Sequence, residues 1–177
     1  HYAEVQVRLD PLERGKGIVI ASETGSDQLS FNWQKAILSA LRTKKHRGVL
    51  TGSELTDVKI TLIAGKGHLK HTEGGDFRQA ASRAVRQALM KTSSILLEPY
   101  VCFELTVPSE SLSKALFDLE SKKAQFEIQD SGDGRSVIIG RGCIRLLAHY
   151  QNEVSAYSKG QGRFAFQPDG YDVCQDR

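Results

Sequence analysis

Cysteine is scarce in this sequence, and long hydrophobic runs are missing. The three cysteines, Cys102, Cys143 and Cys174, are widely spaced and form no Cys-x-x-Cys pair, which argues against a disulfide framework and a zinc site. No stretch approaches the roughly 18 apolar residues that a membrane span needs, and no signal peptide precedes the first strand-like segment. We therefore expect a cytoplasmic protein with no membrane contact.

Nucleotide-binding and hydrolase motifs are also missing. Nothing matches the GxxxxGK[ST] pattern of a phosphate-binding loop, and no GxSxG nucleophile elbow occurs. The glycine pairs at residues 15–17 and 65–67 lack the strand-loop-helix setting of a phosphate cradle, and we interpret both as turns. We expect no catalytic site, no cofactor and no metal in the chain itself.

The small net charge conceals an uneven distribution. The 177 residues carry a formal net charge of +3 at pH 7. Residues 1–97 hold 15 Lys and Arg against 9 Asp and Glu, whereas residues 98–177 hold 9 against 12. Because an excess of positive charge favours a polyanionic partner, only the first half is suited to nucleic acid.

The first half predicts a small unit of strands and helices. Alternation of apolar and polar residues predicts strands over residues 2–9, 18–21 and 58–63. Pro and Gly breakers separate the first two strands and suggest a hairpin. Apolar residues at helical spacing predict helices over residues 31–45 and 76–90.

Each predicted helix has a group of basic residues outside its apolar stripe. One group surrounds the end of the first helix and consists of Arg42, Lys44, Lys45, His46 and Arg47. Helix capping and solvation explain this group, as does contact with phosphate. The second helix presents a group outward that consists of Arg78, Arg83, Arg86 and Lys91. A solvated face explains these four as readily as RNA does.

Residues 65–72, which we name the histidine loop, join the third strand to the second helix. Two glycines permit a sharp reversal there, and two histidines and two lysines have little apolar company. The pair His68 and His71 is compatible with a metal, although no third ligand is evident. The pair is equally compatible with RNA, where imidazole stacks on bases and lysine binds phosphate.

The second half predicts a compact unit that begins near Pro99. Strands are expected over residues 101–107, 124–129, 136–140 and 162–166, with helices over residues 109–123 and 144–157. A turn at residues 130–134 joins the middle two strands, and residues 167–177 form an extended end. The resulting βαββαβ order is that of a ferredoxin-like domain.

Several segments carry a resemblance to a known family. Residues 48–62, followed by a glycine turn with His68, resemble the fourth domain of elongation factor G, and residues 95–100 resemble the junction to its fifth domain. Residues 96–100, 75–78 and 170–173 resemble in particular the tetracycline-resistance ribosomal protection proteins.

The resemblance implies an α+β fold with two small domains. Residues 1–96 would form a ribosomal-protein-type βαβ domain like domain IV of elongation factor G, which probes the aminoacyl-tRNA site. Residues 97–177 would form a ferredoxin-like βαββαβ domain like domain V.

The resemblance also implies a role on the ribosome. Such proteins are ribosome-dependent GTPases whose amino-terminal domains bind GTP and Mg²⁺, and those domains are absent from this sequence, which we interpret as a piece of a longer protein. The fourth domain reaches the small-subunit RNA of the decoding site, where protection proteins displace tetracycline. The fifth domain lies near the large-subunit stalk base. We expect a monomer.

By position, three loops are the expected ribosome and RNA contacts. Their residues are Arg14, Gly15, Lys16, Gly17, Leu50, Thr51, Gly52, Ser53, Lys66, Gly67, His68, Leu69, Lys70 and His71. His68 matches the tip histidine of elongation factor G, whereas the three residues after it lie where protection proteins carry a more apolar tip with proline.

Other functions stay open at this point. Within the family, the alternative is a translocation factor or a paralogue with no resistance role. Outside it, the alternatives are a free-standing RNA-binding module and a metal-dependent enzyme that uses His68, His71 and a carboxylate.

Overall fold

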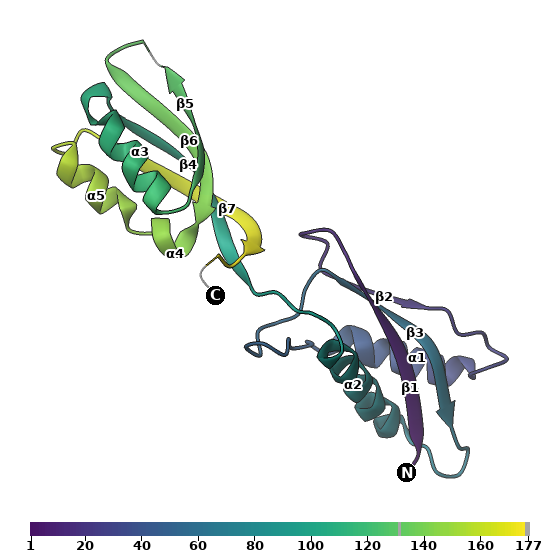
Figure 1. Cartoon of the computed structure of the whole chain (residues 1–177). Coiled ribbons are helices and arrows are strands. Elements are labelled where there is room, and N and C mark those ends of the chain that lie inside the picture. The colour runs from purple at the N-terminus through teal and green to yellow at the C-terminus, as the bar shows by residue number, and fades with distance from the viewer. Residues whose placement is uncertain (131, 176–177) are drawn as a thin grey trace. The chain divides into compact units, whose positions relative to one another are not determined.

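The chain forms two compact units, each a small sheet with helices on one face (Figure 1). The computed structural model describes residues 1–130 and 132–175, and the units are His1–Leu96 and Leu97–Arg177. This architecture confirms the predicted α+β class with two small domains. None of the helices in the described residues is long and apolar enough to cross a membrane.

The first unit is a three-stranded mixed sheet covered by two helices. Its elements are β1 (Ala3–Pro11), β2 (Ile18–Ser22), α1 (Phe31–Thr43), β3 (Val58–Gly67) and α2 (Gly74–Met90). The strand order is β1-β3-β2, with β1 antiparallel and β2 parallel to β3. The predicted hairpin of the first two strands is therefore wrong, because β3 lies between them and pairs with both.

The apolar faces of the two helices meet β3 in a single core. The buried side chains of this core are Leu29, Ile37, Leu41, Ile60, Leu62, Phe77, Ala81, Val85 and Leu89. Burial of an aliphatic or aromatic side chain stabilises a fold by about 1.5 to 3 kcal/mol. Both predicted amphipathic stripes are thereby confirmed, although α1 ends at Thr43 rather than residue 45.

The glycines of the histidine loop have a packing role that the turn interpretation missed. Gly65 and Gly67 lie within β3, opposite Val5 and Ala3 of β1, so residues 65–67 are not a turn. A Cβ atom on Gly67 would lie 3.0 Å from ring atoms of both Trp33 and Phe77. Glycine is needed here because the helices approach the strand backbone closely.

The second unit is a four-stranded antiparallel sheet with helices on one face. Its elements are β4 (Leu97–Pro108), the 3₁₀ turn η1 (Ser109–Ser111), α3 (Leu112–Ser121), β5 (Gln125–Asp130), β6 (Arg135–Cys143), α4 (Ile144–Leu147), α5 (Tyr150–Tyr157) and β7 (Arg163–Val173). The strand order β5-β6-β4-β7 confirms the ferredoxin-like topology.

Three details of the second unit differ from the sequence prediction. The helix expected over residues 144–157 is divided into α4 and α5. The extended end continues as β7 to Val173, because it pairs with Leu97 and its neighbours at the start of β4. Within the predicted turn at residues 130–134, Ser131 lies outside the described residues.

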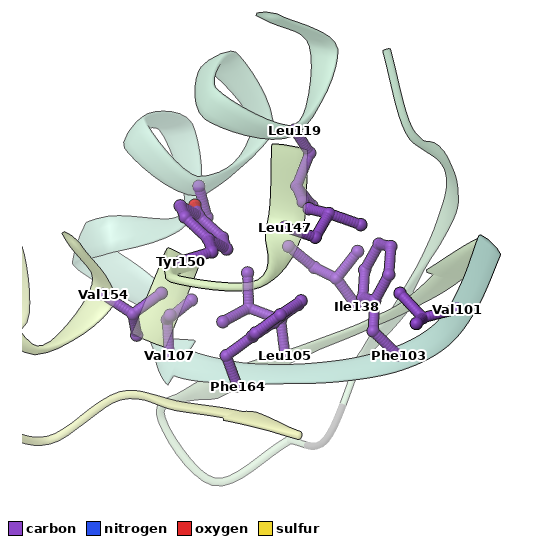
Figure 2. Packing of buried hydrophobic residues seen from close by; sticks show 11 residues of the cluster. Val101, Phe103, Leu105, Val107, Leu119, Ile138, Leu147, Tyr150, Val154 and Phe164 are labelled. Atoms are coloured by element: carbon purple, nitrogen blue, oxygen red, sulfur yellow. The ribbon is translucent and has the colours of Figure 1, made fainter. Parts of the chain in front are cut away.

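The core of the second unit lies between the sheet and its helices (Figure 2). Leu105 and Ile138 from the central strands pack with Leu119 of α3 and Tyr150 of α5, and all four are at most 1% exposed. Tyr150 also donates a hydrogen bond to the buried Asp118, 3.2 Å away. Asp118 also accepts a hydrogen bond from Nζ of Lys114 at 2.7 Å, so both oxygens of the buried carboxylate have partners, and the bond from Tyr150 links α3 to α5.

Glu98, at the start of β4, is nearly buried and has polar partners. Nε of Arg145 donates to its carboxylate over 3.2 Å. Burial raises the pKa of Glu98, but hydrogen bonds from Arg145, Cys143 and Cys174 outweigh that effect and lower it below the ordinary value. Glu98, which lies within the family-like segment of residues 95–100, thus has a structural role in the second unit.

We predict that Glu98→Gln destabilises the second unit at neutral pH by about 1 to 2 kcal/mol, because charge-assisted hydrogen bonds are lost. A carboxyl whose pKa is lowered by folding stabilises the fold above the pKa of the unfolded chain and ceases to do so as pH falls. The difference from wild type should therefore begin to shrink as pH falls below about 4.3, the pKa of an unperturbed Glu, and disappear once the pH is below the lowered pKa of the folded state. Urea unfolding monitored by far-UV circular dichroism across pH measures it.

The matched control is Glu104→Gln, because Glu104 is exposed on the same strand. This variant should match wild type at every pH. An equal loss of stability in both variants, or a Glu98→Gln deficit that persists at low pH, would contradict the assignment.

Candidate nucleic-acid interface

The histidine loop projects from the end of β3, where the strand turns toward α2 (Figure 1). His68, Lys70 and His71 are all exposed, and Leu69 is 91% exposed although it is apolar. An isolated apolar side chain with this exposure contributes nothing to the core. The loop therefore presents two imidazoles, two ammonium groups and one aliphatic side chain to solvent.

Hydrogen bonds fix the backbone of the loop. The amides of His71 and Thr72 both donate to the carbonyl of His68 at 2.9 Å. The amide of His68 donates to Oγ1 of Thr72 at 2.7 Å, and that hydroxyl in turn donates to the carbonyl of Tyr2. The amide of Tyr2 donates to the carbonyl of His71 at 2.9 Å. The loop is thus a closed turn attached to the start of β1.

The two imidazoles of the loop lie against each other. The ring centroids of His68 and His71 are 4.7 Å apart with an interplanar angle of 28°. The amide of Lys70 donates to Nδ1 of His68 over 3.3 Å. A stacked pair of flat imidazole rings offers a platform for a nucleobase, since bases stack on aromatic side chains.

A metal centre at this pair lacks its third ligand. Among residues 1–130 and 132–175, no group of three or more His, Cys, Asp or Glu side chains is arranged to hold a metal ion. The carboxylate that a metal-dependent enzyme would need beside His68 and His71 is therefore not found there.

An open groove of about 730 Å³ lies beside the loop. Its lining combines rings, hydroxyls, amides and one carboxylate, and consists of His1, Tyr2, Ser26, Asp27, Gln28, Leu29, Ser30, Trp33, Gly65, Lys66, Gly67, His68 and His71. Gly67 contributes to the groove because its backbone lies against Trp33. Aromatic surface and mixed hydrogen-bonding groups are typical of sites for unpaired RNA.

The other two predicted loops lie at the opposite end of the sheet. Residues 14–17 follow Pro11, which pairs with Val58 at the beginning of β3, whereas the histidine loop follows its end. The ten residues of β3 separate the two ends by roughly 30 Å. Residues 14–17 therefore do not adjoin the histidine loop and do not share one contact surface with its tip.

Asp57 fixes the turn at residues 14–17 to the beginning of β3. Its carboxylate accepts the amide of Gly17 at 3.0 Å, and its carbonyl accepts the amide of Leu12 at 2.8 Å. Residues 50–53 lie in the connection that leads into Asp57, closed by a 2.8 Å hydrogen bond from the amide of Gly48 to the carbonyl of Ser53. Gly15 and Gly17 have φ values of 87° and 68°, as expected for a turn.

The basic group after α1 consists of two sets of residues. One set bonds to nearby backbone carbonyls, and the other set is exposed. His46 is buried, with Nε2 2.9 Å from the carbonyl of Leu41, and Arg47 donates to the carbonyl of Gly52 at 2.9 Å. Both therefore serve the local fold. Arg42 and Lys44 are exposed, and Nζ of Lys44 donates to Oγ of Ser82 at 3.0 Å.

Sequence reasoning missed the residues that shape the loop from outside it. Tyr2 and Trp33 line the groove, and Thr72 holds the turn. The sequence pattern includes Thr72 only as the last residue of the loop. Its partner Tyr2 is 70 residues away in the sequence, so only the pairing of β1 with β3 reveals their contact.

Protein families match both units. Residues 1–93 match the family described as elongation factor G, domain IV. Residues 95–177 match the family described as elongation factor G C-terminus.

Individual proteins agree with the family matches. The chain is 32% identical to Tetracycline resistance protein TetP of Clostridium perfringens over 96% of this chain and 26% of that protein. It is 30% identical to Elongation factor G 2 of Desulfotalea psychrophila over 97% of this chain and 25% of that protein. The chain thus spans about a quarter of the length of these relatives. A crystal structure of a protein from Thermus thermophilus shares the fold, with a TM-score of 0.83 and 20% identity over 97% of this chain and 26% of its own.

We predict that Thr72→Val loosens the loop without unfolding the unit. Valine keeps the branched shape but removes the hydroxyl that bonds both His68 and Tyr2. Loss of one or two hydrogen bonds should lower local stability by about 1 kcal/mol. Hydrogen exchange should therefore be several-fold faster at the amides of residues 68–72.

Thr51→Val is the control, because among the residues that the structure describes the hydroxyl of Thr51 bonds only with Ser53, outside the histidine loop. It should leave exchange in the histidine loop unchanged. Unaltered exchange in Thr72→Val would mean that the hydroxyl does not hold the turn.

Proposed function

The chain belongs to the elongation factor G family, and from this premise we propose that it is the ribosome-binding part of a translation factor of the tetracycline-resistance ribosomal protection type. In this proposal the histidine loop enters the decoding site of the small subunit and dislodges tetracycline. The similarity to Tetracycline resistance protein TetP supports the choice of type.

One observation carries the proposal, namely the exposed and hydrogen-bonded turn at the end of β3. Its backbone is tied to β1 through Tyr2, so the contact surface is preorganised and loses little entropy on binding. The stacked rings of His68 and His71 offer a surface for a base, and Lys66 and Lys70 offer charge for phosphates. Leu69, exposed at the same turn, is the apolar group available to press against a base or a drug.

The rest of the protein would supply what this chain lacks. GTP and Mg²⁺ would be held by amino-terminal domains of the parent protein. In that protein, a cytoplasmic GTPase, the second unit would contact the large-subunit stalk base. We propose that the parent acts as a monomer.

A second candidate function is translocation, or a paralogous role without resistance. The similarity to Elongation factor G 2 favours it, as does the presence of Lys70 and His71 where protection proteins carry a more apolar tip with proline. A polar tip suits contact with tRNA and messenger as well as contact with a drug site.

We predict that the full-length parent protein with GTP restores cell-free translation at an inhibitory tetracycline concentration. His68→Ala combined with Lys70→Ala in the parent should reduce that rescue by about 10-fold, because a base-stacking surface and a phosphate contact are lost. Both side chains are exposed, so the fold should remain intact. The readout is the tetracycline concentration that halves translation.

Arg14→Ala combined with Lys16→Ala is the matched control, because this pair lies at the opposite end of the sheet. The control should rescue as well as wild type. Full activity of the histidine-loop variant would refute the role of the loop. A parent that hydrolyses GTP on ribosomes but gives no rescue would refute drug displacement in favour of translocation.

A further inference from the structure

The outer faces of α1 and α2 carry positive charge that nothing in the unit neutralises. The exposed basic residues on these helices and just beyond their ends, which we name the helix patch, are Lys35, Arg42, Lys44, Arg78, Arg83, Arg86 and Lys91. Helix α1 contains no Asp or Glu, and α2 contains only Asp76. Across the part of the chain that the structure describes, none of the seven forms an ion pair with a carboxylate.

The one acidic side chain of α2 is already engaged. Asp76 accepts the amide of Glu73 at 2.9 Å in the capping box, and its carboxylate lies 3.1 Å from Nδ1 of His1. It therefore serves the start of the helix. Asp76 does not offset the cations further along α2.

The two helices form one surface. Trp33 of α1 and Phe77 of α2 pack with ring centroids 5.5 Å apart, and Nζ of Lys44, just after α1, lies 3.0 Å from Oγ of Ser82 on α2. Both helices pack on β3 through the same core. Cations on both helices are thus held on one rigid scaffold.

In the second unit, by contrast, lysines on or beside the helices form ion pairs with carboxylates. On α3, Lys114 pairs with Asp118 at 2.7 Å, and Lys122, just after α3, pairs with Glu153 of α5 at 3.1 Å. Like charges three or four residues apart, such as Arg83 and Arg86, cost roughly 0.2 to 0.5 kcal/mol per pair. A surface that only faces solvent would gain nothing from this repulsion. Because the helices of the second unit pair their charges and those of the first unit do not, we infer that the helix patch has a function.

We propose that the helix patch is a second RNA-binding surface, which contacts the phosphates of base-paired RNA. It goes beyond the proposed function because it needs neither the histidine loop nor a drug. Four of the seven cations are arginines, whose planar guanidinium matches phosphate better than lysine does. Phe31 at the first residue of α1 is 70% exposed, but α2, which carries Arg78, Arg83 and Arg86, exposes no aromatic side chain on which an unpaired base could stack. Around these arginines, duplex RNA is therefore favoured over single-stranded RNA.

The length of the surface fits a duplex backbone. At 1.5 Å per residue, Arg78 and Lys91 are separated by about 20 Å along the axis of α2. Such a surface spans several phosphates, and each contact releases counterions from the RNA. Binding should therefore be independent of sequence and weaken steeply with salt.

The test is fluorescence anisotropy of the purified chain with a labelled RNA duplex of about 16 base pairs, measured over about 50 to 200 mM KCl. Arg83→Ala combined with Arg86→Ala should lower the affinity and reduce the slope of log K against log salt by about 2. Lys159→Ala combined with Arg163→Ala removes two exposed charges from the second unit and should leave both quantities as in wild type.

Stability separates lost binding from lost folding. Because alanine is a better helix former than arginine and like charges are removed, Arg83→Ala with Arg86→Ala should unfold at the same urea concentration as wild type or a slightly higher one. His68→Ala with Lys70→Ala should retain the duplex affinity, which keeps this test separate from that of the histidine loop.

Three results would overturn the proposal. The first is a salt slope that is the same in the helix-patch variant and in wild type. The second is loss of duplex binding in the histidine-loop variant but not in the helix-patch variant. The third is displacement of the labelled duplex by polyglutamate of equal total charge as effectively as by unlabelled duplex, since that would indicate attraction for any polyanion.

Discussion

Pairing of β3 on both of its edges is the constraint on which the first unit depends. The strand is antiparallel to β1 and parallel to β2, so its side chains Ile60 and Leu62 are enclosed and its ends define the ends of the unit. At one end, Asp57 holds the turn at Gly17. At the other end, Gly67 lets Trp33 and Phe77 lie against the backbone, and the histidine loop emerges from a rigid base.

The two units differ in how their charged side chains are arranged. The first unit concentrates cations on an exposed turn and on the outer faces of α1 and α2, whereas the second unit pairs its helical charges internally, as in Lys114 with Asp118. Membership of the elongation factor G family places both patterns in a protein that we propose to act on RNA. The histidine loop offers two imidazole rings and the exposed side chain of Leu69 for a specific site, while the helix patch offers only charge. The histidine loop would thus provide specificity for one RNA site, and the helix patch would provide affinity for RNA of any sequence.

Local patterns in the sequence predicted the elements but not how they meet. Alternation over residues 58–63 and the stripe from Phe77 to Leu89 were sufficient for β3 and α2, because periodicity reports burial directly. The false hairpin arose because breakers between adjacent strands do not reveal a third strand inserted between them. Gly65 and Gly67 were misread as a turn because a close helix contact and a turn both favour glycine.

The site was harder to predict than the fold, because its contacts join residues that are far apart in the sequence. His68 could be identified from the sequence and by resemblance, but the contact of Thr72 with Tyr2 joins residues 70 positions apart. The placement of Lys16 far from the histidine loop likewise follows from sheet pairing alone. Glu98 was recognised as part of a family segment, yet its partner Arg145 lies on α4, 47 residues later.

Site-directed photocrosslinking tests whether the histidine loop enters the decoding site. A photoreactive phenylalanine derivative placed at Leu69 or at Lys16 of this chain would be activated on ribosomes at low salt, and the crosslinked RNA mapped. We expect crosslinks from position 69 to small-subunit ribosomal RNA at the decoding site, and none there from position 16. Crosslinks to that site from position 16 but not from position 69 would contradict it.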